Sequence, residues 1–251
     1  MQATGSKPMG ATNEAAAAAA VQQMFNTIAP RYDLLNHVLS ANVDKLWWRR
    51  TARRFKTVLD NPDARILDIC CGTGDLTLAL LKHRPHDARP VLAVDFAHGM
   101  LVRGATKFVA HKSNVQVIEA DALHLPVASG SLDLVVSAFG FRNLANYQVG
   151  LNEFYRVLKP GGQLGILDFS EPGGAFGKLY AIYFRRVLPS IGRMLGGTAG
   201  PYNYLPASVR KFPPPPELLA LMRKTGYVAA EWTPYTFGIA GLYVAQRAIA
   251  G

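Results

Sequence analysis

The expected fold of this chain is decided by Ile66-Leu67-Asp68-Ile69-Cys70-Cys71-Gly72-Thr73-Gly74-Asp75-Leu76. In this stretch an apolar strand that carries an acid leads into a sharp turn with two glycines, and a helix follows. A second apolar strand, Val91 to Val94, ends in Asp95, 21 residues after Gly74. Small turn residues let the backbone approach a ligand, and an acid at this position accepts hydrogen bonds from ribose hydroxyls. The pattern therefore predicts a nucleoside pocket.

The composition favours one globular domain with appendages. The chain has 251 residues, of which 49% are hydrophobic, enough for one sizeable core. It contains no run of about 18 apolar residues, so no transmembrane helix is expected. The two adjacent cysteines argue against a disulfide scaffold and for a reducing compartment. No metal site is expected, because no Cys-x-x-Cys or His-x-x-x-His spacing is present.

The charge balance indicates an anionic partner. The 27 Lys and Arg residues against 17 Asp and Glu give a net charge of +10, which suits nucleic acid or an acidic membrane surface. Between Glu171 and Glu217 there is no acid. Six basic residues lie there among large apolar ones: Lys178, Arg185, Arg186, Arg193, Arg210 and Lys211. This segment is typical of an interfacial helix on a membrane; the alternative is a basic helix that covers the core, and both can hold.

The chain is expected to have three parts. Residues 1–13 form a flexible leader, and residues 14–57 form an N-terminal helical cap with helices at 14–28 and about 32–57. Residues 58–251 form the main domain, with a basic, apolar, lid-like insertion at about 172–212.

From residue 65 the pattern alternates between strands and helices. Strands are expected at about 65–70, 91–95, 115–119, 132–138 and 163–169, and helices at about 75–83, 97–111 and 147–158. This order predicts an α/β fold, with a mostly parallel sheet covered by helices on both faces. A helix at 217–225, stopped by Gly226, and a hairpin of strands 227–232 and 239–246 complete the sheet at its edge.

The glycine-rich turn resembles that of the class I S-adenosylmethionine methyltransferases. A dinucleotide fingerprint needs a third glycine where Thr77 stands. An acid on the first strand, a glycine turn and an acid ending the second strand are the pattern of the methyltransferases, with Cys70 at the first of their three glycine positions. The resemblance implies a Rossmann-like, mostly parallel seven-stranded sheet whose last strand is antiparallel, with S-adenosyl-L-methionine as cofactor. For Asp68 the alternative is a cap on a neighbouring helix.

Later segments extend the expected cofactor site. Glu119-Ala120-Asp121-Ala122 follows the third strand, where this group places an acid and a small residue beside adenine, and Ala138 ends the fourth strand. The expected cofactor-binding residues are Asp68, Cys70, Gly72, Thr73, Gly74, Asp95, Asp121, Ala122 and Ala138.

A narrower resemblance links the chain to the menaquinone/ubiquinone-biosynthesis C-methyltransferases. The segments that carry it lie in the expected order from residue 21 to 247: 25–36, 67–76, 139–144, 156–170 and 202–210. The resemblance implies methyl transfer from S-adenosylmethionine to a ring carbon of a prenylated quinol. The double cysteine and the Arg-Lys-Phe-Pro stretch at 210–213 favour the menaquinone branch; the ubiquinone-pathway benzoquinol stays open.

The chemistry of such a reaction points to particular residues. A neutral aromatic carbon is a weak nucleophile, and removing a ring hydroxyl proton makes a phenolate with charge on that carbon. A phenol titrates near ~10, so the site must favour the anion. Arg142 is the expected oxyanion partner, directly or through water, and Asn143 is expected to orient that water or the second ring oxygen. Phe139 and Phe141 are expected pocket walls.

The expected cap supplies two more catalytic candidates. Tyr32 and Asp33 are expected to close over the substrate, with Asp33 or Asp168 as proton acceptor. Structural alternatives stay open for each candidate. Arg142 would pair with an acid at a strand end, Asn143 would cap a helix, and Tyr32 and Asp33 would only fix the first helix to the next.

The expected partner is a prenylated quinol in the membrane. We therefore expect a cytoplasmic protein with peripheral contact at the anionic inner face of the membrane, and no nucleic-acid partner. A nucleic-acid methyltransferase is the alternative, but the Asn/Asp-Pro-Pro-aromatic run of exocyclic-amine enzymes is missing after the fourth strand, where Ser137-Ala138-Phe139-Gly140 stands. A non-catalytic nucleoside-binding module is the reading if Arg142 is structural. The sequence sets no oligomeric state.

Overall fold

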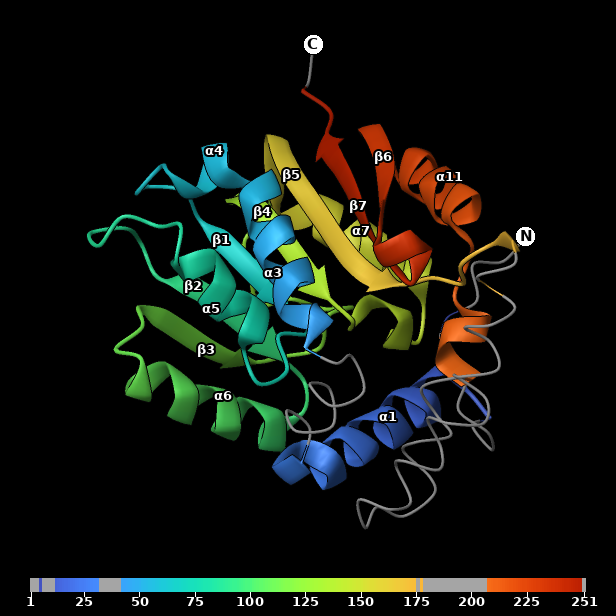
Figure 1. Cartoon of the computed structure of the whole chain (residues 1–251), viewed down its shortest axis with the longest axis horizontal. Helices are drawn as coiled ribbons and strands as arrows, with labels where there is room; N and C mark the ends of the chain where they lie inside the picture. Colours follow the sequence, from blue (N-terminus) through green and yellow to red (C-terminus); the bar gives the residue numbers. More distant parts are fainter. Residues whose placement is uncertain (1–4, 6–11, 32–41, 175–176, 178–206, 250–251) are drawn as a thin grey trace.

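A computed structural model describes residues 5, 12–31, 42–174, 177 and 207–249. It contains a seven-stranded sheet in the order β3-β2-β1-β4-β5-β7-β6 (Figure 1). The strands are β1 (Ile66–Ile69), β2 (Val91–Asp95), β3 (Val115–Glu119), β4 (Leu132–Ala138), β5 (Leu158–Phe169), β6 (Tyr227–Tyr235) and β7 (Ala240–Arg247). β1 to β5 pair in parallel, and β7 is antiparallel to both of its neighbours. The expected seven-stranded sheet with an antiparallel last strand is confirmed.

Helices cover both faces of the sheet. The main helices are α1 (Glu14–Ile28), α3 (Val43–Arg54), α4 (Lys56–Leu59), α5 (Asp75–Leu81), α6 (His98–Ala110), α7 (Tyr147–Val157) and α11 (Pro215–Thr225). Because side chains alternate along each strand, β1 supplies Ile66 to one core and Leu67 to the other. The first core lies under α3, α4 and α5, with α6 on the same side, and the second lies under α7 and α11.

α1 lies across the end of the sheet where the parallel strands finish (Figure 1). Its start is fixed by Asn13, whose side chain accepts a hydrogen bond of 2.8 Å from the backbone of Ala16. Its last turns, with the 3-10 helix η1 (Ala29–Arg31), pack on the beginning of α6. The Asn26 side chain accepts from the backbone N–H of Gly99 at 2.8 Å. The helix therefore stands beside the loops where α/β sheets bind ligands.

Several expected elements have the predicted bounds: α1, β2, β3 and β4. Others differ locally. α7 ends at Val157, because Leu158 is already extended (φ −68°, ψ 141°) and begins β5. The run Lys159 to Gly162, expected to stop the helix, is thus the first part of β5, with a register shift against β4. Gly226 ends α11 in the left-handed conformation (φ 108°), as predicted.

The expected helix at about 32–57 is observed as α3 and α4, separated at Phe55. Trp47, Trp48 and Phe55 are buried against the strands, so this part packs as a layer on the sheet face. Residues 32–41 and most of the expected leader and insertion (1–4, 6–11, 175–176 and 178–206) lie outside the described residues. Among the residues that are described, no helix has both the length and the apolar character needed to cross a bilayer.

Candidate active site

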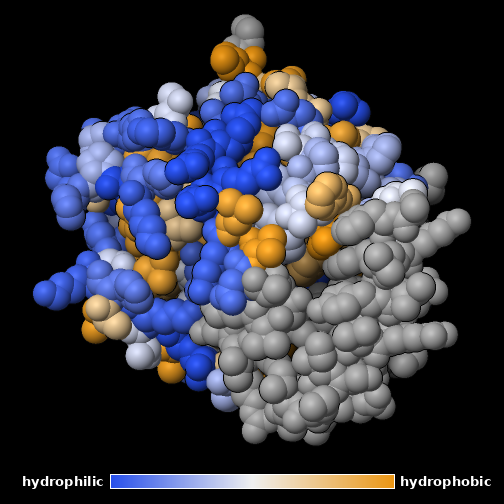
Figure 2. All heavy atoms as spheres, in the orientation of Figure 1, coloured by the Kyte–Doolittle hydropathy of each residue, from blue (hydrophilic) through white to orange (hydrophobic). Residues whose placement is uncertain are grey.

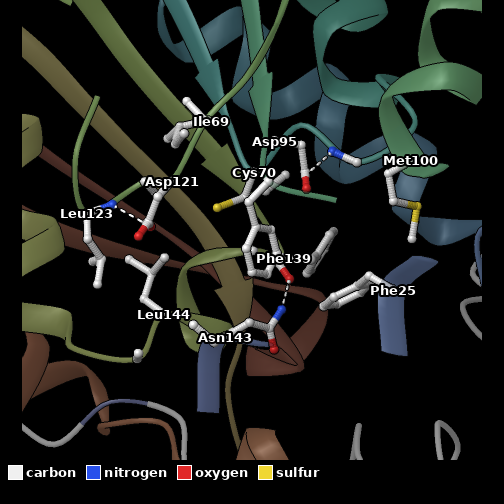
Figure 3. A pocket seen from close by; sticks show the side chains of 18 residues that line it. Phe25, Ile69, Cys70, Asp95, Met100, Asp121, Leu123, Phe139, Asn143 and Leu144 are labelled. Atoms are coloured by element: carbon white, nitrogen blue, oxygen red, sulfur yellow. Dashed lines mark hydrogen bonds between the residues drawn. The ribbon is translucent and has the colours of Figure 1, made fainter. Parts of the chain in front are cut away.

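A pocket opens at the carboxyl ends of β1, β2 and β4, with α1 on one side (Figure 3). It is lined by Ala18, Phe25, Ile69, Cys70, Gly72, Asp95, Phe96, Met100, Ala120, Asp121, Ala122, Leu123, Ala138, Phe139, Gly140, Asn143, Leu144 and Ala145. Most of these side chains are apolar or small. Three polar side chains also line the pocket: Asp95 at the end of β2, Asp121 after β3 and Asn143 after β4. An apolar cleft with a few convergent polar groups is the usual form of a small-molecule site.

The turn after β1 forms one wall of the pocket. Cys70, Gly72 and Gly74 have left-handed backbones with φ of 55°, 57° and 85°. A Cβ on Gly74 would lie 2.2 Å from the ring of Phe108 in α6, so the second glycine of the motif is needed for helix packing. Burial raises the pKa of the Cys70 thiol well above its ordinary value, which keeps it neutral. The turn therefore offers backbone and a small neutral side chain to a ligand.

Asp95 fixes this turn against the end of β2. One carboxylate oxygen accepts from the backbone N–H of Gly72 at 2.9 Å, and the other accepts from Ala97 at 2.9 Å. Burial raises the pKa of Asp95, and the backbone donors oppose the shift. A carboxylate has about four acceptor positions, so Asp95 keeps room for further donors such as ribose hydroxyls.

Asp68 lies behind the turn rather than in the pocket lining. Its side chain is 0% exposed; Oδ2 accepts a hydrogen bond of 2.6 Å from the Thr77 hydroxyl in α5, and Oδ1 is buried without a hydrogen-bond partner among the described residues. Burial raises the pKa of Asp68 to about 7, although the Thr77 hydrogen bond lowers it. Thr77 lies in the first turn of α5, and its backbone N–H as well as its hydroxyl lowers the pKa of Asp68. The contact with the start of a neighbouring helix, the structural alternative for Asp68, is therefore present.

The turn after β4 forms the opposite wall. Phe139 has a left-handed backbone (φ 57°) and donates its N–H to the carbonyl of Leu167 at 2.8 Å. Gly140 lies against the β1 turn, where an added Cβ would be 2.2 Å from the Cys70 Cβ. The Phe139 ring packs 4.5 Å from the Phe169 ring and 5.8 Å from the Trp47 ring. Left-handed non-glycine residues cost free energy and gather at functional sites, and this pocket has two of them.

Arg142 lies in the 3-10 helix η2 (Phe141–Asn143) and is held by an acid at the end of β5. The residue is 5% exposed. Its guanidinium donates to Asp168 at 2.9 Å and to the carbonyl of Phe139. The Arg142 backbone N–H donates to the other oxygen of Asp168 at 3.0 Å, and the Phe169 ring lies 5.1 Å from the guanidinium. The pairing with a strand-end acid, the structural alternative for Arg142, is present.

Asn143 is the polar side chain of this turn that lines the pocket. Its amide donates to the Phe139 carbonyl at 3.3 Å (Figure 3), the same oxygen that Arg142 contacts. Asn143 does not cap the next helix. That cap is Asn146, whose side chain accepts from the backbone of Gln148 and Val149 at 3.1 Å each.

The pocket brings together part of the predicted set: Cys70, Gly72, Asp95, Asp121, Ala122, Ala138 and Asn143. Four predicted residues lie outside the lining and only support the turns that form it: Asp68, Thr73, Gly74 and Arg142. Tyr32 and Asp33 lie outside the described residues. Asp168, a predicted proton acceptor, is 0% exposed and accepts three N–H donors. Of the two expected wall residues, Phe139 lines the pocket and Phe141 is buried in the core between Tyr147 and Phe154.

Sequence reasoning missed the apolar lining from other elements: Ala18 and Phe25 of α1, Phe96, Met100 of α6, Leu123 and Leu144. Phe96 and Leu123 each lie within two residues of a predicted acid, and this proximity was the available signal. Phe25 begins the segment 25–36 that carries the family resemblance, but Ala18 has no local signal, because its place depends on how α1 crosses the sheet.

A model of the ubiE/COQ5 methyltransferase family matches residues 11–247. The chain belongs to this family. A demethylmenaquinone methyltransferase of Thermus thermophilus is 46% identical over 225 residues, which cover 89% of this chain and 100% of that protein. That of Deinococcus radiodurans is 44% identical, covering 91% and 92%. A ubiquinone/menaquinone biosynthesis C-methyltransferase of Geotalea daltonii is 39% identical, covering 90% and 96%. The chain is therefore a ubiE/COQ5-family methyltransferase.

Solved structures share the fold of this methyltransferase at low identity. A Thermotoga maritima protein described as a SAM-dependent methyltransferase, possibly of histamine, has a TM-score of 0.62 and 18% identity, covering 90% of this chain and 98% of that one. The [4+2]-cyclase SpnF has a TM-score of 0.69 and 15% identity, covering 98% and 100%. These likenesses show the fold alone, and the second belongs to an enzyme with a different chemistry.

Proposed function

We propose that this chain transfers a methyl group from S-adenosyl-L-methionine to a ring carbon of a prenylated demethylmenaquinol, giving menaquinol. The observation that carries the proposal is the pocket between the β1 and β4 turns. It occurs in a chain 46% identical, over 89% of its length, to a demethylmenaquinone methyltransferase. Family membership supports the methyl transfer, and the lining supports a nucleoside beside an aromatic substrate.

The residues of the pocket fit the cofactor. Asp95 keeps acceptor positions for a ribose, and Asp121 lies in the lining with one oxygen held by the backbone of Leu123 at 2.9 Å. Phe96, Met100, Ala122 and Leu123 supply apolar surface for a purine. The absence of a Cβ at Gly72 and Gly140 leaves backbone at the pocket wall. When bound, S-adenosylmethionine supplies an electrophilic methyl group on a positively charged sulfur.

The remaining task of the chain is to hold the quinol and favour its anion. Asn143 is the amide in the lining that can donate to a ring oxygen, and Phe139 and Phe25 offer faces for the rings. Excluding water in this apolar setting strengthens such a hydrogen bond. Arg142 contacts the same Phe139 carbonyl from behind, so we propose that it acts on the oxyanion through the position of Phe139 and Asn143. Direct contact would require its bond to Asp168 to open.

Two other substrates compete with the naphthoquinol. The benzoquinol of the ubiquinone pathway is favoured by the name of the Geotalea daltonii relative, which includes both quinones. A nucleic acid is disfavoured by the apolar lining of the pocket, since bases are recognised by hydrogen bonds to their edges. We propose no nucleic-acid partner.

The prenyl chain requires access to a membrane. We propose that the protein works in the cytoplasm, as a peripheral protein at the anionic inner face of the membrane, because the net charge is +10 and basic surfaces bind anionic lipids. The insertion at 172–212, the segment first expected to carry this contact, lies largely outside the described residues.

Methyl transfer from labelled S-adenosylmethionine tests the proposal. We expect incorporation into a reduced demethylnaphthoquinol with a short prenyl chain, less into the benzoquinol precursor, and none into RNA. Incorporation into RNA with none into either quinol would overturn it.

The role of Asn143 has a separate test. Asn143→Ala should lower kcat about 100-fold with little change in cofactor affinity, as for the loss of one oxyanion donor. Gln148→Ala is the matched control, because its amide bonds Asn152 and Thr225 and lies outside the pocket lining. Equal rates for the two variants would remove Asn143 from the mechanism.

A further inference from the structure

The corner between β6 and β7 exposes an aromatic side chain on a strained backbone. Thr236, Phe237 and Gly238 form the 3-10 helix η4 (Thr236–Gly238), with φ of 45°, 57° and 87°. Phe237 is 82% exposed. A left-handed backbone is unfavourable for β-branched and bulky residues, and a large apolar side chain with this exposure is uncommon on a strained turn. Such a combination points to a function outside the core.

Two contacts fix this corner to α3. The Trp47 indole donates to the Thr236 hydroxyl at 2.8 Å, and the Arg50 guanidinium lies 4.3 Å from the centre of the Tyr235 ring. The Trp47 ring also packs 5.8 Å from the ring of Phe139, which lines the pocket. The corner is therefore connected to the pocket wall through the buried Trp47 side chain.

The exposed face of α3, next to the η4 corner, is positively charged. Leu46, Arg49, Arg50 and Arg53 follow helical spacing on one exposed face, and Leu46 is 40% exposed. Figure 2 shows hydrophilic residues gathered over α3 with hydrophobic ones among them. Within the described part of the chain, no ion pair involves Arg49, Arg50 or Arg53.

The acids near this surface do not neutralise it. Arg54 pairs with Glu231 at 2.7 Å and Lys56 with Asp60 at 2.6 Å. Glu171, which is exposed, follows Ser170, whose hydroxyl bonds the Gly238 carbonyl at 2.7 Å. Among the described residues, Arg49, Arg50 and Arg53 have no carboxylate partner, so this surface stays positive around the apolar side chains of Leu46 and Phe237.

We propose that the exposed face of α3 and the η4 corner dock the protein on an anionic lipid bilayer. Phe237 and Leu46 enter the headgroup region, and Arg49, Arg50 and Arg53 contact lipid phosphates, as in other interfacial helices. The proposal rests on the proposed function in one respect: a surface next to the pocket would let a prenylated quinol pass between bilayer and site. An RNA backbone would use the arginines but has no need of an exposed phenyl ring at a fixed corner.

Co-sedimentation of the full chain with phosphatidylcholine vesicles, with and without phosphatidylglycerol, tests the docking surface. We expect binding only with the anionic lipid, weakening as salt is added. Arg49→Gln with Arg53→Gln should weaken binding about 30-fold, from the usual contribution of each basic residue at such a surface. Lys82→Gln with Lys112→Gln removes the same charge from exposed residues outside α3 and η4 and should change binding about twofold or less.

Phe237→Asn separates insertion from folding. Asparagine adopts the left-handed region more readily than phenylalanine, so this variant should be at least as stable as the wild type while binding vesicles about tenfold more weakly. Turnover on a short-chain quinol without vesicles should be unchanged in every variant. If the wild type binds phosphatidylcholine equally well, if the variants bind like the wild type, or if RNA binds in place of vesicles, the docking proposal is wrong. Absence of turnover on any quinol, with vesicle binding intact, would instead refute the proposed function.

Discussion

The two fully buried aspartates at the site, Asp68 on β1 and Asp168 on β5, have opposite surroundings. Asp68 accepts one hydrogen bond from Thr77 and has an oxygen without a partner among the described residues. Asp168 accepts from the Arg142 guanidinium, the Arg142 backbone and its neighbour Phe169. Burial penalises an ionised carboxylate unless donors compensate it. The β5 acid is compensated within the chain, and the β1 acid is not.

This difference suggests that the acid behind the β4 turn has a structural role, and that the acid behind the β1 turn responds to a bound ligand. The Arg142–Asp168 pair is complete without a ligand and holds the Phe139 turn in its left-handed conformation. Asp68 is incomplete, so a positively charged or hydrogen-bonding ligand near the β1 turn would favour its ionised form.

The largest effect is expected from Arg142→Ala. Removing one partner of a buried ion pair leaves the other charge uncompensated and costs about 3–5 kcal/mol, measurable as a lower free energy of unfolding in urea. The exposed pair Arg54–Glu231, with side chains 48% and 54% exposed, is the control: Arg54→Ala should cost at most about 1 kcal/mol. The double variant Arg142→Met with Asp168→Leu should recover much of the loss. Equal costs at the two arginines would contradict the structural role of the pair.

Asp68→Asn should stabilise the protein in a pH-dependent way. The pKa of Asp68 is about 7 in the folded chain against 3.8 for the free group. Between these values the folded state holds a proton that the unfolded state has lost, so wild-type stability falls as pH rises from about 4 to 7. The neutral amide keeps an acceptor for Thr77 and avoids this loss.

Unfolding of wild type and Asp68→Asn at pH 5 and pH 8 measures that difference. Three pKa units correspond to about 4 kcal/mol, so the variant should gain up to about this amount at pH 8 and much less at pH 5. The carboxylate of Glu119, which is exposed and pairs with His98, provides the control, since Glu119→Gln should show no comparable gain. A constant difference across this range would mean that Asp68 is ionised in the folded chain.

Gly140→Ala tests the contact between the two halves. The new Cβ would lie 2.2 Å from the Cys70 Cβ, and overpacking of this kind costs about 1–3 kcal/mol. Adding Cys70→Gly removes the opposing atom at a position whose φ of 55° suits glycine. The double variant should therefore recover most of the stability and the affinity for S-adenosylhomocysteine. If the double variant is no more stable than Gly140→Ala alone, the contact with the Cys70 Cβ is not the cause of the lost stability.

The contrast also explains what the sequence could predict. Apolar runs and turn residues placed β2, β3, β4 and α1, because their periodicity is local. The motif acids Asp95 and Asp121 were placed in the pocket for the same reason, as each ends or follows a strand. Arg142 shows the limit: its neighbours in sequence do not reveal whether it points to the substrate or to Asp168, 26 residues away. The bonds to Asp168 and Phe139 decide that orientation.

The burial of Asp68 could not be predicted from the sequence either. Its motif suggested ligand contact, yet only the packing of α5 over β1 shows that Thr77 occupies one oxygen. Thr77 is also the residue that stands where a dinucleotide turn has its third glycine. Its hydroxyl has a structural use at that position, which no spacing rule indicates.

The smallest effect is expected from Thr77→Val, which keeps the side-chain shape and removes the 2.6 Å hydrogen bond to Asp68. That bond lowers the pKa of Asp68 against the effect of burial, so its loss should move the pKa upward. At pH 5, where Asp68 is protonated, the variant should lose about 1 kcal/mol, the usual net value of one hydrogen bond. At pH 8 the loss should be larger, because an ionised acceptor makes the stronger bond. Carbon-13 titration of the Asp68 carboxyl measures the pKa, and a midpoint that falls would mean that Thr77 does not stabilise the ionised acid.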